Sequence, residues 1–183
     1  MIHFNIHNNF NLNKIAREFQ RKAPVMVNDA ADIIVSDIKQ GIEYGRDIHG
    51  KQFAPLKPST IQAKRAKGSK SPRTVLKDTG MMQKLPPTKR ATSSRFIALI
   101  GIAQKRREIG RYHQEGIKPH TITARPGKVL PMCTKTGKFI FRKKVSHPGT
   151  PPREWFGVSN SANKKIGRMV KMTISKIFRS TWN

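Results

Sequence analysis

The chain of 183 residues is strongly basic, with 37 Lys and Arg against 10 Asp and Glu and a formal net charge of +27 at neutral pH. This excess predicts an acidic neighbour, which could be nucleic acid, an anionic membrane or an acidic protein surface. A hydrophobic share of only 36% indicates that part of the chain is extended or is ordered only by partners. The single cysteine, Cys133, excludes an internal disulfide and a cysteine-based zinc site. The longest apolar run, near residues 96–103, is too short to span a bilayer.

The first half of the chain is predicted to be mainly helical. Alternating apolar residues at 2–6 favour a strand, and a short helix capped by Asn13 is expected to follow. Pro24 is expected to begin the best amphipathic helix, which ends between about residues 40 and 44. Its apolar residues recur at helical spacing and comprise Val27, Ala31, Ile34 or Val35, Ile38 and Ile42. A short basic helix is expected after Pro58, and the sequence at 78–80 favours a turn into another short helix.

The second half of the chain alternates strand and helix signals. Residues 95–103 are apolar and rich in strand formers, which favours a central strand, although a buried helical segment shares this pattern. A helix over 104–115 is expected to use Ile109 and Tyr112 as its apolar anchors and to end at Gly116. Residues 120–144 predict a long β-hairpin around a glycine turn. Ser159 or Ser161 is expected to cap a final helix that ends near residue 178, with its apolar stripe at Ile166, Met169 with Val170, Thr173 and Ile177.

These elements predict one α+β domain over residues 1–183. It comprises a small antiparallel sheet, a long helix packed on that sheet, a projecting β-hairpin at 120–144 and a C-terminal helix. The hairpin has too little apolar material to be stable alone in water, so we expect it to contact a neighbouring subunit or another protein. Deleting residues 127–144 should therefore leave a folded domain that cannot assemble.

The sequence contains no motif for nucleotide binding, metalloprotease, serine hydrolase or thiol redox chemistry. The nearest acid–histidine neighbours are Asp47 with His49 and His113 with Glu115, which we interpret as a loop pair and a helix-surface pair. Ten carboxylates are too few and too dispersed to favour a metal-dependent nuclease. The chain is therefore predicted not to be an enzyme, and no cofactor or metal is expected.

Three acid-free clusters are the candidate contacts with DNA or with an acidic protein. They lie in the short basic helix, in the hairpin and in the C-terminal helix, and comprise Lys64, Arg65, Lys67, Arg142, Lys143, Lys144, Lys164, Lys165, Arg168 and Lys171. Phe139 and Phe141 alternate beside the hairpin cluster. This spacing is typical of a ribbon that stacks on single-stranded nucleic acid, but the favoured interpretation is that the two rings face a core or a neighbouring subunit.

Four segments occur in a recognisable order. They read GKQFAPL at 50–56 followed by PSTI at 58–61, LKDTG at 76–80, YHQEG at 112–116 and TPPREWFGVS at 150–159. This succession resembles the phage virion morphogenesis, or tail completion, family of tailed phages and Mu-like prophages, from about residue 25 to the C-terminus. Phe53 stands where the family often has tryptophan, and Glu154-Trp155 replaces the usual proline–phenylalanine pair.

The same segments contain residues that suit structural pins. Phe53, Pro55 and Leu56 are expected to hold a loop on the core, and Asp78 with Gly80 is expected to form a tight turn in which the carboxylate accepts backbone amides. Trp155 and Phe156 are expected to be mostly buried at the start of the last helix, so that truncating either costs on the order of 3 kcal/mol.

The resemblance implies a structural protein of the virion, assembled in the host cytoplasm. It implies a homo-oligomeric ring, usually six-fold, at the head–tail junction or the tail terminus. Its partners would be the neighbouring connector and tail-tube proteins and, through non-specific contacts, packaged DNA, with no membrane. The alternative from another class is a free basic nucleic-acid-binding protein, which explains the charge equally well but does not explain the order of the four segments.

Overall fold

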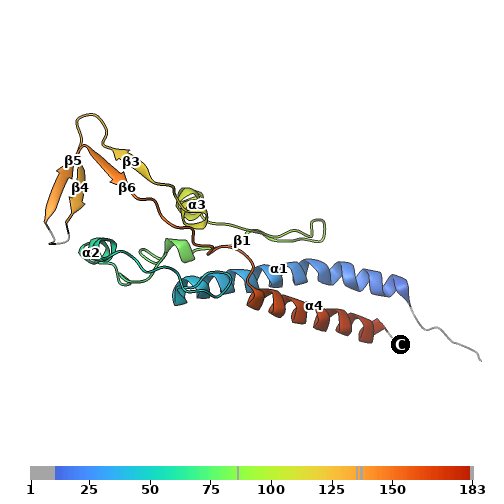
Figure 1. Cartoon of the computed structure of the whole chain (residues 1–183). Coiled ribbons are helices and arrows are strands. Elements are labelled where there is room, and N and C mark those ends of the chain that lie inside the picture. The colour runs from blue at the N-terminus through green and yellow to red at the C-terminus, as the bar shows by residue number, and fades with distance from the viewer. Residues whose placement is uncertain (1–10, 86, 135, 137, 182–183) are drawn as a thin grey trace, which may run out of the picture.

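The computed structural model describes residues 11–85, 87–134, 136 and 138–181, and it is markedly elongated (Figure 1). Two long helices, α1 (Leu12–Tyr44) and α4 (Asn160–Thr181), lie side by side and run antiparallel. A bent arm of β-strands projects from the end of the molecule at which α1 ends, away from the C-terminus of α4. The strand expected at residues 2–6 lies outside the described residues.

Helix α1 is one continuous helix of 33 residues, so the expected break at Pro24 is wrong. Its N-cap is Asn11, whose side chain accepts a hydrogen bond from the amide of Lys14 at 3.0 Å, in place of the expected Asn13. Pro24 removes one helical N–H donor. The helix continues because α1 lies in contact with α4 and Met26, two residues after Pro24, is buried, and such packing outweighs local propensity. Gly45 ends the helix in the left-handed conformation, with φ of 68°.

Helix α4 matches the sequence pattern closely. Ser159 is its cap, because the hydroxyl accepts a hydrogen bond from the amide of Ala162 at 3.0 Å. The expected apolar face is the buried face: Ala162 and Ile177 are buried, and Ile166, Met169 and Thr173 are half-buried. None of the described helices is both long and apolar enough to cross a membrane.

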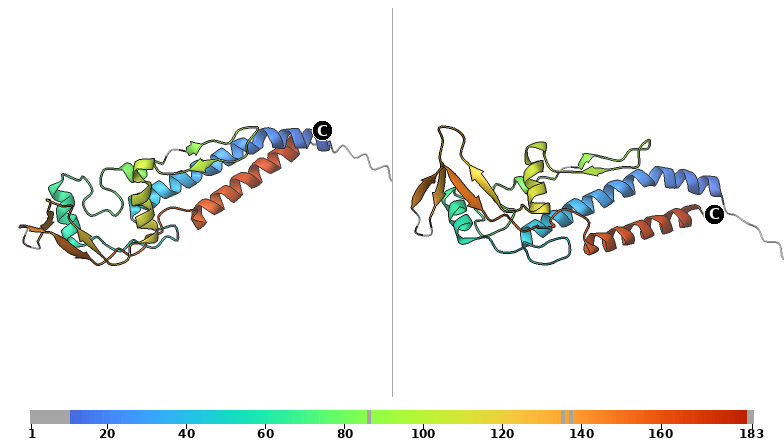
Figure 2. Two further views of the ribbon diagram at one scale, coloured as in Figure 1. Left: turned by 90° about the horizontal axis from the view of Figure 1, so that it is seen from above. Right: turned by 45° about the horizontal axis from the view of Figure 1, so that its top comes forward.

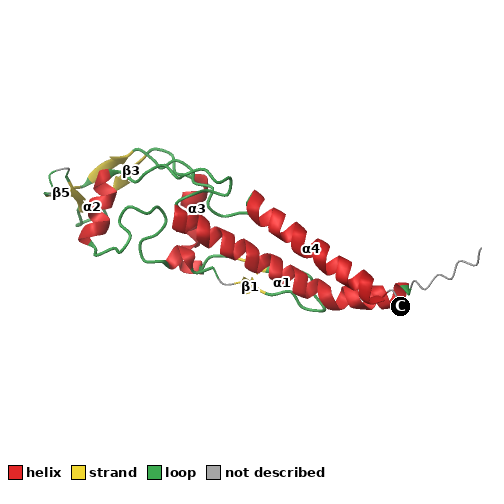
Figure 3. Cartoon of the chain, turned by 90° about the horizontal axis from the view of Figure 1, so that it is seen from below, coloured by secondary structure: helices red, strands yellow, loops and turns green. Residues whose placement is uncertain are grey.

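The α+β class is confirmed, and the described strands form three separate antiparallel pairs (Figure 3). Strand β1 (Pro87–Lys89) pairs with β2 (Leu99–Ile100), β3 (His120–Thr123) with β6 (Lys144–His147), and β4 (Leu130–Cys133) with β5 (Phe139–Arg142). The central strand expected over 95–103 is therefore wrong, since within this range only Leu99 and Ile100 form a strand. Phe96, Ile97 and Leu99 are exposed, and among the described residues β2 pairs with β1 alone.

The loop between β1 and β2 lies along α1 (Figure 2). The Asn28 side chain donates to the carbonyl of Ala91 at 3.1 Å and accepts from its amide at 2.9 Å. Arg90 makes a two-pronged contact with the carboxylate of Asp32, at 3.0 and 3.1 Å, and this contact raises the pKa of Arg90 further. Helix α1 therefore organises both α4 and this loop.

The remaining helical segments are short. They are α2 (Pro58–Ala66), the 3-10 turns η1 (Met81–Gln83) and η2 (Gln104–Arg106), and α3 (Arg107–Glu115). The first two confirm the predicted basic helix and the turn into a short helix, where Gly80 has φ of 73°. Helix α3 also lies where expected, but its anchors do not: Ile109 and Tyr112 are exposed, and the buried residue is Gly110.

The predicted hairpin is confirmed, and it is longer and more bent than the sequence indicated. The β3–β6 ladder forms its base and extends to His147, and β4–β5 forms its outer part. Between the two ladders, residues 124–129 form a loop opposite Lys143, and Gly127 in that loop has φ of 71°. These extra residues on one side only bend the ribbon, as a large β-bulge does. We call residues 117–150 the arm.

Candidate assembly interface

Three of the four family-like segments supply residues to one small core at the end of α1, and the fourth, residues 112–116, is hydrogen-bonded beside it. Val35, Ile38 and Ile42 of α1 are buried against residues that follow later in the chain, some of them outside these segments. Those partners are the buried Val75, Leu76, Met82, Leu85 and Trp155 and the half-buried Phe53, Leu56, Ile100, Ile102 and Phe156. The order of the segments along the chain thus reflects a shared junction, which we call the motif junction.

Trp155 is the centre of the motif junction. It is 3% exposed, and its indole N–H donates to the carbonyl of Gly110 at 3.1 Å. A side chain at Gly110 would collide with Ile102 and would lie 3.1 Å from the Trp155 ring, so only glycine lets α3 approach this closely. Phe156, which was also expected to be mostly buried, is half-buried, and its ring packs edge-on against Trp155 at 5.4 Å.

A reciprocal hydrogen-bonded clamp joins α3 to the segment before α4. The Gln114 side chain donates to the carbonyl of Phe156 at 3.2 Å and accepts from its amide at 3.0 Å. One residue before Gln114, the carbonyl of His113 accepts from the amide of Arg153 at 2.7 Å. These contacts explain why the YHQEG and PPREWFG segments accompany each other.

The other sequence-predicted pins have mixed outcomes. Phe53 and Leu56 pack on the core as expected, whereas Pro55 is exposed. Gly80 adopts the left-handed conformation that the turn requires. Asp78 is exposed, and within the described residues its carboxylate accepts no amide of the turn, so that part of the expectation is wrong. Instead, Asp78 acts electrostatically on Lys64.

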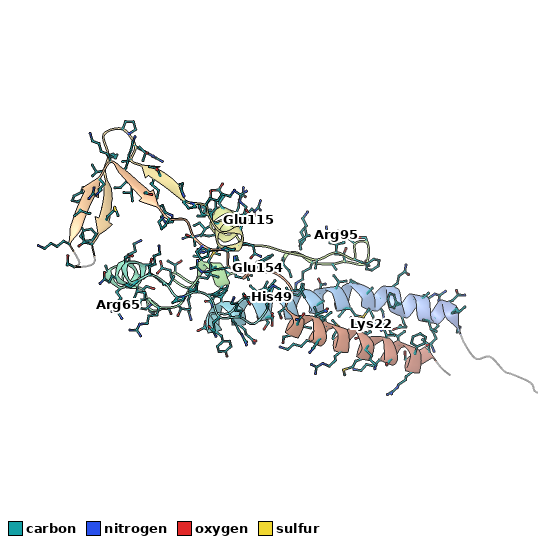
Figure 4. All side chains as sticks on the ribbon, in the orientation of Figure 1. Lys22, His49, Arg65, Arg95, Glu115 and Glu154 are labelled. Atoms are coloured by element: carbon teal, nitrogen blue, oxygen red, sulfur yellow. The ribbon has the colours of Figure 1, made fainter. Side chains whose placement is uncertain are left out.

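The titratable groups at the motif junction serve the structure. Asp47 accepts the amides of His49 and Lys51 at 2.9 and 2.8 Å, which confirms the loop interpretation of this pair. The imidazole of His49 lies 2.8 Å from Glu154, with both side chains more than half exposed (Figure 4). Burial, assisted by the guanidinium of Arg153, lowers the pKa of His113. Among the described residues, no three His, Cys, Asp or Glu side chains gather as a metal site.

Lys64 binds backbone carbonyls of its own chain, so we no longer count it among the candidate contacts with DNA or an acidic protein. Its ammonium donates to the carbonyls of Ser71, Thr74 and Lys77 at 3.0, 2.8 and 2.7 Å. An ammonium has three N–H donors, so none is left for a phosphate. Burial lowers the pKa of Lys64, an effect that Asp78 partly opposes.

The remaining members of the three basic clusters are exposed, and two clusters share one end of the molecule. Helix α2, with Arg65, and the outer arm lie side by side (Figures 1 and 2), while α4 lies at the opposite end. The segments 48–77 and 116–152, which supply α2 and the arm, contain no Asp or Glu. The arm end therefore concentrates uncompensated positive charge.

The total surface is far larger than a monomer of this mass normally exposes. The chain of 20.7 kDa has an accessible surface of 14023 Å², whereas a compact monomer would expose about 8,900 Å². Of the chain's total surface, the residues outside the described ranges account for at most about 2,400 Å², the surface of a fully extended chain of their mass. An excess of about 2,700 Å² remains, more than three times the roughly 800 Å² that one partner buries in a standard interface.

Comparison with known proteins gives the family. The model of the phage virion morphogenesis family matches residues 9–175. No curated protein and no solved structure matches the chain. Since the family match covers nearly the whole chain and includes all four segments of the motif junction, the protein belongs to the phage virion morphogenesis family.

Proposed function

We propose that the protein is a structural subunit of a tailed-phage particle that forms a ring, six-fold in the family pattern, at the head–tail junction or the tail terminus. Family membership supports a role in virion assembly. The main support for a ring is the excess accessible surface. About 2,700 Å² is enough for each copy to form interfaces with two flanking copies and one axial neighbour. The neighbours above and below would be connector and tail-tube proteins.

The exposed cations fit such a position. Arg65, Lys67 and residues 142–144 at the arm end, and Lys164, Lys165, Arg168 and Lys171 on α4, would meet packaged DNA or acidic faces of the neighbouring proteins. Contacts with DNA would go to phosphates, because packaged DNA has no fixed register against a ring. Neutralising a cluster that faces DNA should impair genome retention, whereas neutralising one that faces an acidic protein should block joining.

The experiment is electron microscopy of the purified full-length protein, combined with light scattering. Closed rings of uniform subunit number are the expected result. A matched variant replaces residues 125–142 by Asn-Gly, which leaves the β3–β6 ladder with a short turn and removes the outer arm. This variant should keep its helical circular dichroism and lose the rings. Loss of the fold instead would show that the outer arm belongs to the core.

The alternative function has its own signature. A free nucleic-acid-binding protein would remain a monomer or dimer at all concentrations and would bind duplex DNA with a steep dependence on salt. That result, together with absence of the protein from purified particles by mass spectrometry, would contradict the structural role.

A further inference from the structure

The outer arm has an uncovered apolar face. In the β4–β5 ladder, Phe139, Phe141 and Pro131 lie on one side, because Pro131 pairs with Phe141 and alternate residues share a face. Both phenylalanines are 65% exposed. On the other side of the ladder, Met132 and Ile140 are half-buried. The exposed face therefore lies against no core of its own chain.

The base of the arm limits where this face can go. Ile117 and Thr150 exchange two backbone hydrogen bonds of 2.9 Å where the arm leaves the body. Gly116 and Gly149 stand at this crossing, and a side chain on either would collide with the opposite backbone. The arm is thus joined to the body at its root, and its outer part extends beyond the end of α1 beside α2 (Figure 1). Its own chain leaves Phe139 and Phe141 65% exposed, so their apolar face is open to another molecule.

The body of the same chain carries a groove that suits such a face. The groove has a volume of about 720 Å³ and lies between β2, α3 and the motif junction. Its apolar lining is formed by Leu99, Ile100, Ile102, Ala103, Trp155 and Phe156. Leu99 on its wall is 48% exposed, although it lies beside the buried residues of the motif junction. A groove of this size and polarity is typical of sites that enclose aromatic groups.

We propose that the arm of one copy inserts Phe139 and Phe141 into this groove of the next copy. A projecting apolar face and an apolar groove at different places on one chain make a heterologous contact, which closes into a ring when the rotation between copies permits. The chain supplies both halves of the contact, and its excess surface provides the area that such an interface needs. This inference rests on the proposed ring and assigns the contact that closes it.

Complementary variants test the contact on the full-length protein. Phe139→Ser with Phe141→Ser removes the arm face, and Leu99→Asp charges the groove. Each variant alone should raise the concentration for half-assembly by at least about 30-fold, the effect of losing one interface hot spot. Met172→Ser, at an exposed position on α4, is the matched control and should leave assembly unchanged. Mixing the arm variant with the groove variant should give heterodimers and nothing larger, since one competent contact remains.

A disulfide trap locates the contact directly. In a Cys133→Ser background, Phe141→Cys with Leu99→Cys should yield a ladder of covalent oligomers on oxidation, and Phe141→Cys with Met172→Cys should yield none. Rings that form without the ladder, and that tolerate both surface variants, would overturn the arm contact and leave the proposed function standing. A wild-type chain that never oligomerises would overturn both. Normal rings with lost binding of a single-stranded oligonucleotide by the arm variant would assign the phenylalanines to base stacking.

Discussion

Replacing Trp155 by alanine should lower the free energy of unfolding by about 4 kcal/mol. Truncating a buried tryptophan or phenylalanine typically costs about 3–5 kcal/mol, and Trp155 is 3% exposed. The variant also loses the indole donor at 3.1 Å from the Gly110 carbonyl, a bond that contributes about 1 kcal/mol within that total. Since whole domains are stable by roughly 5–15 kcal/mol, the loss should be plain in urea unfolding followed by far-ultraviolet circular dichroism.

Trp155→Phe separates the two contributions. It keeps an aromatic ring in the junction and removes the donor, so it should cost about 1–2 kcal/mol by leaving the Gly110 carbonyl without that partner. Phe156→Ala should cost less than Trp155→Ala, because Phe156 is only half-buried. A loss below about 1 kcal/mol for Trp155→Ala, with an unchanged denaturant slope, would refute the view that the motif junction is the stabilising core and would suggest that Trp155 packs against a neighbouring subunit.

Three further outcomes are expected. Gly110→Ala should lower the free energy of unfolding by about 1–3 kcal/mol, because the new methyl collides with neighbouring side chains. Gly167→Ala, in open space on α4, should raise it by about 0.5–1 kcal/mol. Urea unfolding measures both variants. Lys64→Met should loosen the loop at 69–77 and speed its proteolysis, while Arg65→Met should not. Because the folded-state pKa of His113 is lowered, the unfolded chain binds its proton first, so stability should fall as the pH drops below about 6.5, and His113→Gln should flatten that fall.

Periodicity predicted the elements whose stability comes from one apolar face. The repeats at Val35, Ile38 and Ile42 and at Ile166 and Ile177 give the two long helices, because a helix packs by its stripe. The same reasoning failed where tertiary contacts decide. Pro24 favours a helix start, but the packing of α1 against α4 keeps the helix continuous through it. The apolar run at 95–103 lacks the partner strands that its composition suggested.

The sequence predicted which segments form the candidate site better than it predicted the contacts between their residues. The order of four segments located the motif junction, and alternation at Phe139 and Phe141 located the arm face. The sequence could not show that Lys64 is bound internally while Arg65 is exposed. Only the folded chain brings three backbone carbonyls within reach of the Lys64 ammonium. It also missed Gly110, whose role is to leave space for Trp155, and the pairing of His49 with Glu154 across 105 positions.

The positive charge of each copy opposes the association of copies into a ring. Five of the ten acids are already paired within the chain, as Glu18–Arg21, Asp32–Arg90, Glu43–Lys77, Glu115–Arg111 and Glu154–His49. Each copy brings a formal net charge of +27 to a ring, and the copies repel one another. Rings of the isolated protein should form more readily as salt rises from about 0.01 to 0.1 M, because the screening length falls from about 30 to 10 Å. A short polyanion should have the same effect as added salt, at a much lower concentration, because it neutralises the positive charge directly. Rings that instead dissociate as salt is added would show that the contacts between copies are ionic, and that the ring satisfies its own charge without an acidic neighbour.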